Sequence, residues 1–206
     1  MSESVIVTFA TTNIAKYCSI KKNLELIFPR VELKLEKIPK NLSVVEGNVS
    51  EIINAREKQK QYSKLLTTLV LSTDEGLYLE GAPDSYQPGA TIHRVLAALK
   101  TQKKTGKELS IYNYLTKYGN KCLLRKVYAI GNEEVSKIII SEIPCIIKAN
   151  DNNKVINPLR QLNSFLTPIG FSNCFSNMSK SELKIYYEKY LSIQMLEIAN
   201  FAHSFL

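Results

Sequence analysis

The sequence has no apolar run long enough to span a membrane, and its opening residues, MSESVIVTFATT, lack the basic leader and long apolar segment of a secretion signal. It also has no C-x-x-C pair: its four cysteines stand alone, and no histidine lies near one at the spacing of zinc ligands. These absences argue against a membrane protein, a secreted disulfide-linked protein and a structural zinc site. We therefore expect a soluble cytoplasmic protein with reduced cysteines.

The sequence has no arginine-rich tract and no aromatic–glycine motif of an RNA-binding sheet, although its formal net charge is +8. A positive charge suits either a nucleic-acid binder or an enzyme that attracts a polyanionic small molecule. The lysines are spread along the chain, which is typical of solvated helix faces. We therefore do not expect nucleic acid to be the partner.

A chain of 206 residues is long enough for one large domain or two small lobes with a substantial core. Apolar patterning and turn residues predict strands at 5–9, 31–35, 68–73, 127–130 and 137–147, the last two joined by a turn at Gly131-Asn132. Helices are predicted at about 14–27, 49–66, 93–99, 111–118 and 179–201. Asn48 should cap the second helix, and Glu51 and Glu182 stand at capping-box positions. The pattern indicates an α/β protein.

Two adjacent carboxylates, Asp74 and Glu75, follow the apolar strand predicted at 68–73. We expect the chain to turn at Gly76, which would place both carboxylates at the C-terminal end of a buried strand, where open α/β sheets carry their chemistry. Carboxylates in such a place are costly unless a cation meets them. Lys58 could provide a positive charge near them, and Glu46 could add a third hard oxygen donor of the kind that Mg²⁺ prefers.

The polar turn Thr11-Thr12-Asn13 follows the first predicted strand and stands at a helix N-terminus, where free backbone N–H groups favour an anion. Lys16 lies one turn into that helix and could reach the same anion. Taken alone, these residues would equally suit an ordinary helix cap with a surface lysine.

The order and separation of these residues resemble those of the Ham1-type inosine triphosphate pyrophosphatases, which act on noncanonical purine nucleotides such as ITP, dITP and XTP. The family's opening Thr/Ser-Gly-Asn-x-x-Lys motif is similar to Thr11-Thr12-Asn13-Ile14-Ala15-Lys16, and its Asn-Ala-x-x-Lys helix to Asn54-Ala55-Arg56-Glu57-Lys58. Its Asp-Asp-Ser-Gly-Leu motif resembles Thr73-Asp74-Glu75-Gly76-Leu77, and its Gly-Ala-Pro is found at Gly81-Ala82-Pro83. The resemblance extends from Val5 to about Tyr86.

The resemblance implies an ITPase- or Maf-like α/β fold, with a mixed twisted sheet flanked by helices and two lobes around a central cleft. It implies one domain over residues 1–206, with residues from about 120 to 177 as the candidate second lobe, and a homodimer. The implied reaction is Mg²⁺-dependent hydrolysis of a nucleoside triphosphate, noncanonical purine nucleotides foremost, to the monophosphate and pyrophosphate.

The resemblance also assigns roles to residues. It implies that Glu46, Asp74 and Glu75 hold the metal, that Asp74, Lys58 and Glu46 are catalytic, and that the phosphate chain is bound by Thr11, Thr12, Asn13, Lys16 and Lys58. Asp74 could instead act as the base that activates water, so its role stays open between these two.

The base-recognition half of the family pattern is not recognisable. Residues 164–168 read SFLTP in place of Phe-Gly-Tyr-Asp-Pro, with Thr167 where the Asp is expected, and no Ser-His-Arg follows Met178-Ser179. Phe165, Tyr187 and Lys189 are candidates for contacting the base. We therefore leave the base unassigned, and a noncatalytic nucleotide-binding regulator or scaffold with this fold is the alternative to an enzyme.

Overall fold

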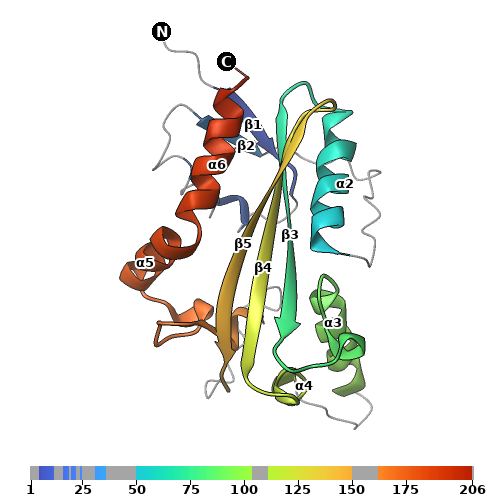
Figure 1. Ribbon diagram of the computed structural model, residues 1–206, viewed down its shortest axis with the longest axis vertical. Coiled ribbons are helices and arrows are strands. Elements are labelled where there is room, and N and C mark those ends of the chain that lie inside the picture. The colour runs from blue at the N-terminus through green and yellow to red at the C-terminus, as the bar shows by residue number, and fades with distance from the viewer. Residues whose placement is uncertain are drawn as a thin grey trace. The chain divides into compact units, whose positions relative to one another are not determined.

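The computed structural model describes residues 5–11, 16–18, 20–21, 24, 31–35, 50–103, 111–149 and 162–205. Six strands form one sheet in the order β2-β1-β3-β4-β5-β6 (Figure 1). They are β1 (Val5–Phe9), β2 (Val31–Leu35), β3 (Leu69–Leu79), β4 (Lys121–Gly131), β5 (Ser136–Ile147) and β6 (Leu166–Pro168). The helices are α2 (Glu51–Ser63), α3 (Ile92–Lys103), α4 (Ile111–Thr116), α5 (Lys180–Tyr190) and α6 (Ser192–His203), and residues 16–18, 20–21 and 24 are also helical. None of the helices in these ranges is long and apolar enough to cross a membrane.

The sheet contains both parallel and antiparallel pairs, as predicted for an α/β protein of this kind. Strand β1 is parallel to β2 and to β3, with Val7 opposite Leu33 and Leu69. Strand β6 is antiparallel to β5. Strands β4 and β5 are joined by the predicted turn, in which Asn132 N–H donates to the Val135 carbonyl over 3.0 Å. The mixed sheet with flanking helices is therefore confirmed.

The chain forms two compact units, and strands β3, β4 and β5 contribute residues to both. Unit 1 consists of Met1–Asp74, Lys126–Ser141 and Tyr187–Leu206, and unit 2 of Glu75–Arg125 and Glu142–Tyr186. The division of the chain that the resemblance implies, one domain with a second lobe at about 120–177, stays a prediction.

In unit 1 the sheet is covered on both faces, which explains its nearly continuous apolar strands. Helix α6 covers one face and α2 the other (Figure 1). The α6 side is the larger core, and burial of each large apolar side chain there contributes about 1.5–3 kcal/mol. It is built from Val5, Val7, Phe9, Ile20, Leu24, Val31, Leu69, Leu71, Tyr128, Ile130, Ile139, Met195, Ile198, Ala199 and Ala202. On the α2 side, Ala55 packs against Val127 and Ala129.

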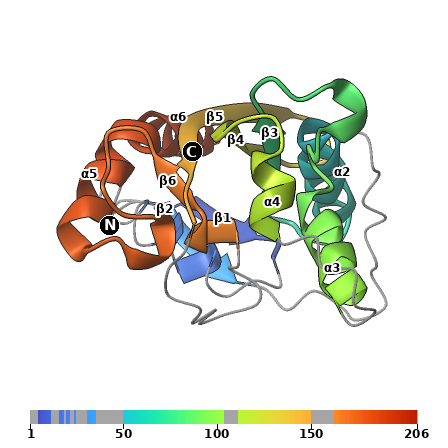
Figure 2. The ribbon, with the colours of Figure 1, turned by 90° about the horizontal axis from the view of Figure 1, so that it is seen from below.

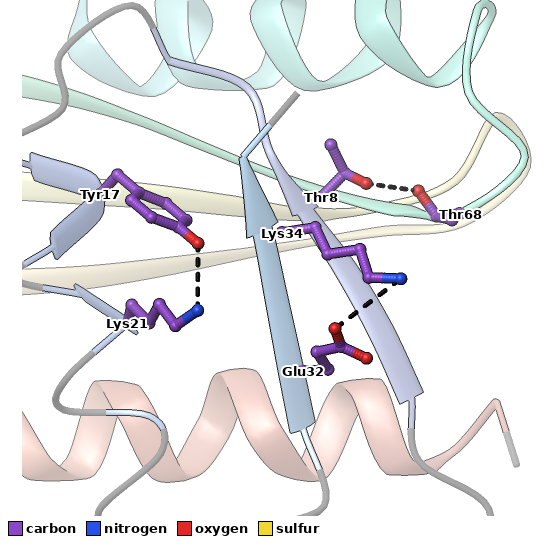
Figure 3. Close-up of polar contacts among 6 residues, drawn as sticks. All are labelled: Thr8, Tyr17, Lys21, Glu32, Lys34 and Thr68. Atoms are coloured by element: carbon purple, nitrogen blue, oxygen red, sulfur yellow. Dashed lines mark hydrogen bonds and ion pairs between the residues drawn. The ribbon is translucent and has the colours of Figure 1, made fainter. Parts of the chain in front are cut away.

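Polar side-chain pairs also lie on the strands of unit 1. The Thr8 and Thr68 hydroxyls are hydrogen-bonded over 2.7 Å, which joins β1 to the residue before β3 (Figure 3). On the exposed side of β2, Lys34 lies 3.7 Å from Glu32, as expected for residues two apart on one strand face. This exposed pair contributes little to stability.

In unit 2 a loop after β3 is fastened to α4 by tyrosines. Tyr86 and Tyr114 stack at 4.7 Å, and each hydroxyl donates to the other residue's carbonyl over 3.1 Å. Burial raises the pKa of both phenols. Gln87 adds to the fastening, because its side chain accepts from Leu79 N–H and donates to the Leu79 carbonyl over 2.7 Å each. Helix α3 is the next helix after this loop in the sequence, and α4 follows it; both are seen in Figure 2.

Strand β3 is longer than predicted, so the expectation of a turn at Gly76 is wrong. The strand continues through Gly76 to Leu79, and the positive φ that marks a turn occurs at Gly81, at 77°. The physical reason lies in Leu77 and Leu79, which are 0% and 3% exposed and continue the alternation of a strand. Asp74 and Glu75 therefore lie within a strand and not at its end.

The C-terminal helix is divided, which the sequence pattern did not predict. Helix α5 ends at Tyr190 and α6 begins at Ser192, with Leu191 between them in a non-helical conformation. Leu191 is buried, and a break there lets two short helices bury different faces. The predicted capping box at the start of α5 is confirmed: Glu182 Oε2 accepts from Ser179 N–H over 2.9 Å, and Ser179 Oγ accepts from Glu182 N–H over 3.2 Å.

We expect the start of α5 to loosen in acid. The pKa of Glu182 is lowered, first by the hydrogen bond from Ser179 N–H and then by those from Asn173 and the Ser179 hydroxyl. A lowered folded pKa means that the carboxylate stabilises the cap above the usual glutamate pKa of about 4.3, and that this contribution is lost as the pH falls through the lowered value. Amide hydrogen exchange in the first turn of α5 should therefore accelerate at low pH beyond its intrinsic pH dependence.

Glu182→Gln should remove that acid sensitivity, while Glu188→Gln, on the same helix but away from its N-terminus, should retain it. Equal behaviour of the two variants would show that the cap is not the acid-sensitive element.

Candidate active site

Helix α2 begins two residues later than predicted. Its N-cap is Ser50, whose Oγ accepts from Ile53 N–H over 3.2 Å, and the predicted cap Asn48 lies outside the described residues. A serine at this position satisfies one of the free N–H groups of the first turn. The helix ends at Ser63 and not near Leu66. These bounds place Asn54 in the second turn and Lys58 in the third.

The side of α2 that faces the sheet is unusually polar, and it is bound there by hydrogen bonds. Gln59 is fully buried and its Nε2 donates to Ser63 Oγ over 2.6 Å and to the Asn132 carbonyl over 3.1 Å. Near the middle of the helix, Ser72 Oγ on β3 donates to the Ala55 carbonyl over 2.5 Å. A buried polar atom that loses its partner costs about 1–3 kcal/mol. Movement of α2 along β3 is therefore opposed by these bonds.

At one end of this polar contact, three side chains form a partly buried cluster: Asp74 from β3 with Asn54 and Lys58 from α2. Asn54 Nδ2 donates to Asp74 Oδ2 over 2.7 Å, and Lys58 Nζ lies 3.5 Å from Asp74 Oδ1. The side chains of Lys58 and Asp74 are 15% and 14% exposed. The sequence placed a lysine near this carboxylate, and the structure brings the two together within unit 1.

Glu75 follows Asp74 on β3 and is half-buried. Glu46 lies outside the described residues. Within the described ranges no three His, Cys, Asp or Glu side chains converge, so the predicted ligand set of Glu46, Asp74 and Glu75 stays a prediction.

The chemistry of the cluster suits a hard cation. Asp74 offers a carboxylate, and Asn54 Oδ1 is a buried oxygen that accepts no hydrogen bond from any residue the structure describes. Carboxylate and amide oxygens are the ligands that Mg²⁺ takes in proteins, usually together with water and substrate phosphates. The residues present therefore fit the implied metal.

The predicted phosphate-binding residues are described only in part. Thr11 follows β1, and its N–H donates to the Phe9 carbonyl over 3.0 Å; Lys16 is helical and half-buried; Thr12 and Asn13 lie outside the described residues. One turn beyond Lys16, Lys21 donates to the Tyr17 hydroxyl over 3.3 Å (Figure 3). Binding of phosphate by this turn stays a prediction.

The candidate base-contacting residues belong to different units. Phe165 and Thr167 lie in unit 2, and Tyr187 and Lys189 in unit 1. Thr167 is on β6, is 1% exposed, and its hydroxyl has no hydrogen-bond partner in the part of the chain that is described. Lys189 lies 5.1 Å from the centre of the Tyr190 ring on α5. Their role at a base stays a prediction.

Two features of the structure were given no role by the sequence. Asn54 was identified only as part of a motif one turn before Lys58, and its contact with Asp74 depends on where α2 lies along β3, which the sequence pattern does not specify. In unit 2, Tyr186 packs edge-on against Phe175 at 5.1 Å and Phe171 at 6.3 Å. The three aromatic residues are close in sequence, but turn residues between them carry no periodic signal.

No protein-family model matches the chain, and no curated protein sequence matches it. Its structure, however, is similar to solved structures over nearly the whole length of both chains. A nucleoside-triphosphatase / dITP/XTP pyrophosphatase from Mycobacterium abscessus has a TM-score of 0.61 at 16% identity, covering 93% of this chain and 98% of that one. The Ham1 protein of Staphylococcus aureus gives 0.55 at 15% identity, covering 97% of each chain. A HAM1 protein from Coxiella burnetii gives 0.54 at 13% identity, covering 98% and 100%. The chain therefore has the fold of the Ham1 proteins, as its motifs led us to expect.

Proposed function

We propose that this protein hydrolyses nucleoside triphosphates to the monophosphate and pyrophosphate. The observation that carries the proposal is the partly buried cluster of Asp74, Lys58 and Asn54 in a chain with the Ham1 fold. The solved structures include a dITP/XTP pyrophosphatase, which supports a nucleotide substrate. The motifs from Val5 to Tyr86 support the same reaction class.

In this proposal the protein's own residues bind the triphosphate and prepare the attacking water. Lys58 contacts the phosphate chain, together with Lys16 and the turn formed by Thr11, Thr12 and Asn13. Asp74 either holds the metal or accepts the proton of the water that attacks the α-phosphorus. The α–β anhydride bond then breaks and pyrophosphate leaves. Glu46 is the third catalytic residue in this assignment, as a ligand of the metal.

Mg²⁺, held by Asp74 with Glu46 and Glu75, would neutralise phosphate oxygens and lower the pKa of a bound water. In this proposal, the contacts within the cluster keep the Asp74 carboxylate and the Lys58 ammonium group in the positions that the reaction requires. The proposal includes a homodimer, which the same resemblance implies, and a cytoplasmic location, which the sequence composition led us to expect. Sedimentation of the purified protein would test the first.

We expect only a modest preference for ITP over GTP, about tenfold or less in kcat/KM, which corresponds to about 1.4 kcal/mol. A binding site distinguishes one purine from another by fixed hydrogen-bond donors and acceptors at the edge of the base. A site that lacks them discriminates mainly by the shape of the base. At the position of the expected Asp, Thr167 carries a hydroxyl that can donate or accept and rotates to suit its partner. Aromatic faces such as Phe165 add stacking, which tolerates different bases.

The test is pyrophosphate release from a panel of ITP, XTP, dITP, GTP and ATP, each with and without Mg²⁺. Mg²⁺-dependent pyrophosphate release from at least one triphosphate is the expected result. A preference for ITP of several hundredfold would mean that residues of the C-terminal third form a purine-specific binding site that the sequence did not reveal. Nucleotide binding without turnover would support the noncatalytic regulator, and preferential binding of polynucleotide with a steep salt dependence would support a nucleic-acid protein.

A further inference from the structure

Two of the four cysteines belong to unit 2 and lie on strands that are neighbours in the sheet (Figure 1). Cys122 is the second residue of β4, and Cys145 lies two residues before the end of β5. Both side chains are buried, at 6% and 0% exposure, and both are thiols that form no disulfide. A buried cysteine on its own often serves as a small apolar side chain. The relative position of these two gives them a further possible role.

Two contacts within unit 2 define the register of β4 against β5 on either side of the cysteines. Ile147 N–H donates to the Asn120 carbonyl over 2.6 Å. Arg125 Nε on β4 donates to Glu142 Oε1 on β5 over 2.9 Å. Each cysteine lies two residues inward from the first pair and three residues from the second. The two cysteines are therefore directly opposite each other in the antiparallel pairing.

Opposed residues of an antiparallel pair direct their side chains to the same face of the sheet. The backbone bond between Asn120 and Ile147 marks a hydrogen-bonded pair, and pairs of this type recur at every second position. The Cα atoms of such a pair are about 5.5 Å apart, within the range of about 4.4–6.8 Å that a disulfide spans. Their Cβ atoms are about 4.5–5.5 Å apart, at or beyond the upper end of the disulfide range, so a bond there needs a small approach of the strands and is readily reduced.

The present contact of the Cys145 thiol does not oppose such a bond strongly. Its Sγ donates to the Ile143 carbonyl over 3.4 Å, along its own strand. A thiol is a weak donor, and S–H···O bonds are weak interactions. Rotation about χ1 takes the sulfur to another staggered rotamer, and the loss of this hydrogen bond costs little.

We propose that Cys122 and Cys145 form a redox-modification site, a dithiol that a small hydroperoxide converts reversibly into a cross-strand disulfide. The Cys122 thiolate attacks one oxygen of hydrogen peroxide, the O–O bond breaks, and a sulfenic acid and hydroxide form. The Cys145 thiolate then attacks the Cys122 sulfur, the S–S bond forms and a second hydroxide leaves. Overall the two thiols lose two electrons and two protons, and hydrogen peroxide becomes two molecules of water.

The order of these steps follows from the position of each thiol. Cys122 comes directly after the exposed residue Lys121, at the start of β4, and the ends of strands open locally more often than their centres. Hydrogen peroxide is small and uncharged and can enter through such an opening. Cys145 is fully buried and opposite, so it reacts with the sulfenic acid before a second molecule of peroxide does.

The test is peroxide treatment of the reduced, folded wild-type protein. The remaining thiols are then alkylated in denaturant with N-ethylmaleimide, and the protein is digested without reduction for mass spectrometry. We expect a peptide pair linked through Cys122 and Cys145 to be at least about tenfold more abundant than any other linked pair, because opposed thiols react without a diffusional encounter. Dithiothreitol should return both residues to thiols.

Cys18 and Cys174 are internal controls, because they are exposed and half-buried. Oxidation governed by exposure alone would modify these two and leave Cys122 and Cys145 as alkylated thiols, and that result would overturn the proposal. Conversion of Cys122 to a sulfinic acid in the wild type, or linkage mainly to Cys18 or Cys174, would overturn it as well.

Single substitutions test the order of the steps. In Cys145→Ala, Cys122 should still be oxidised and should accumulate as the sulfenic and sulfinic acids, because the second thiol is missing. In Cys122→Ala, Cys145 should stay reduced, and Cys174→Ala should form the disulfide as the wild type does. Oxidation of Cys145 in Cys122→Ala as fast as that of Cys122 in Cys145→Ala would contradict the assigned order. The test on the wild-type chain does not depend on the folding of these variants.

This inference goes beyond the proposed function and stands apart from it. Disulfide formation is measured without nucleotide or turnover, so a wild-type protein that releases no pyrophosphate but links Cys122 to Cys145 would contradict only the proposed function. An active protein whose two cysteines do not become linked would contradict only the redox site.

Discussion

Asp74→Asn should lower kcat by about 10²-fold or more, a rise of at least about 2.7 kcal/mol in the activation barrier. The substitution keeps the size of the side chain and its contact with Asn54, but it removes the negative charge that a metal ligand or a general base needs. Steady-state pyrophosphate release at saturating Mg²⁺ measures the loss. Activity close to that of the wild type would remove Asp74 from the mechanism.

The same variant should fold. Asp74 is paired with Lys58 in the structure. The lysine loses a partner in Asp74→Asn, so a small loss of stability is expected, about 1 kcal/mol because both side chains retain some exposure to water. Glu80→Gln is the control for charge removal, since Glu80 is exposed and pairs with Lys121 in unit 2. It should leave kcat unchanged.

Lys58→Ala should weaken the binding of a nucleoside triphosphate by about 10- to 10²-fold and that of the monophosphate much less. A charge-assisted contact of this kind is worth about 1.5–3 kcal/mol, and the proposed contact is with the phosphate chain, most of which the monophosphate lacks. Calorimetric titration with a non-hydrolysable triphosphate and with the monophosphate gives both affinities.

Lys60→Ala provides the matched control, because Lys60 lies on the exposed side of the same helix and carries the same charge. It should change both affinities by less than about twofold. Equal weakening of triphosphate and monophosphate binding by Lys58→Ala would place Lys58 outside the phosphate site, as would an equal effect of the two lysine substitutions.

Much of the fold could be predicted because the sequence pattern and the packing agree. Strands β1 and β2 are found where alternation and β-branched residues predicted them, and the capping box at Glu182 was visible as a serine three residues before a glutamate. Strand β3 was predicted too short because Gly76 was interpreted as a turn. A strand that is hydrogen-bonded to neighbouring strands on both sides can contain a glycine, although local propensity alone would place that glycine in a loop.

The sequence predicted the contact between the charged residues of the candidate site, Asp74 and Lys58, but not the contact made by its neutral residue, Asn54. A carboxylate that follows an apolar strand is costly without a cation nearby, and the sequence therefore indicated Lys58 as a partner of Asp74. Asn54 has no charge to require a partner, and its contact with Asp74 depends on where α2 lies along β3. The candidate base-contacting residues carry no local sequence pattern that would specify a base site.

The most direct test of the proposed reaction is to identify its products by ³¹P NMR after incubation of the wild-type protein with ITP and Mg²⁺. Attack at the α-phosphorus yields inosine monophosphate and pyrophosphate in equal amounts, with no diphosphate at any time, and we expect this result together with its loss in Asp74→Asn. Formation of inosine diphosphate and inorganic phosphate, or no turnover of any triphosphate under these conditions, would contradict the proposed function.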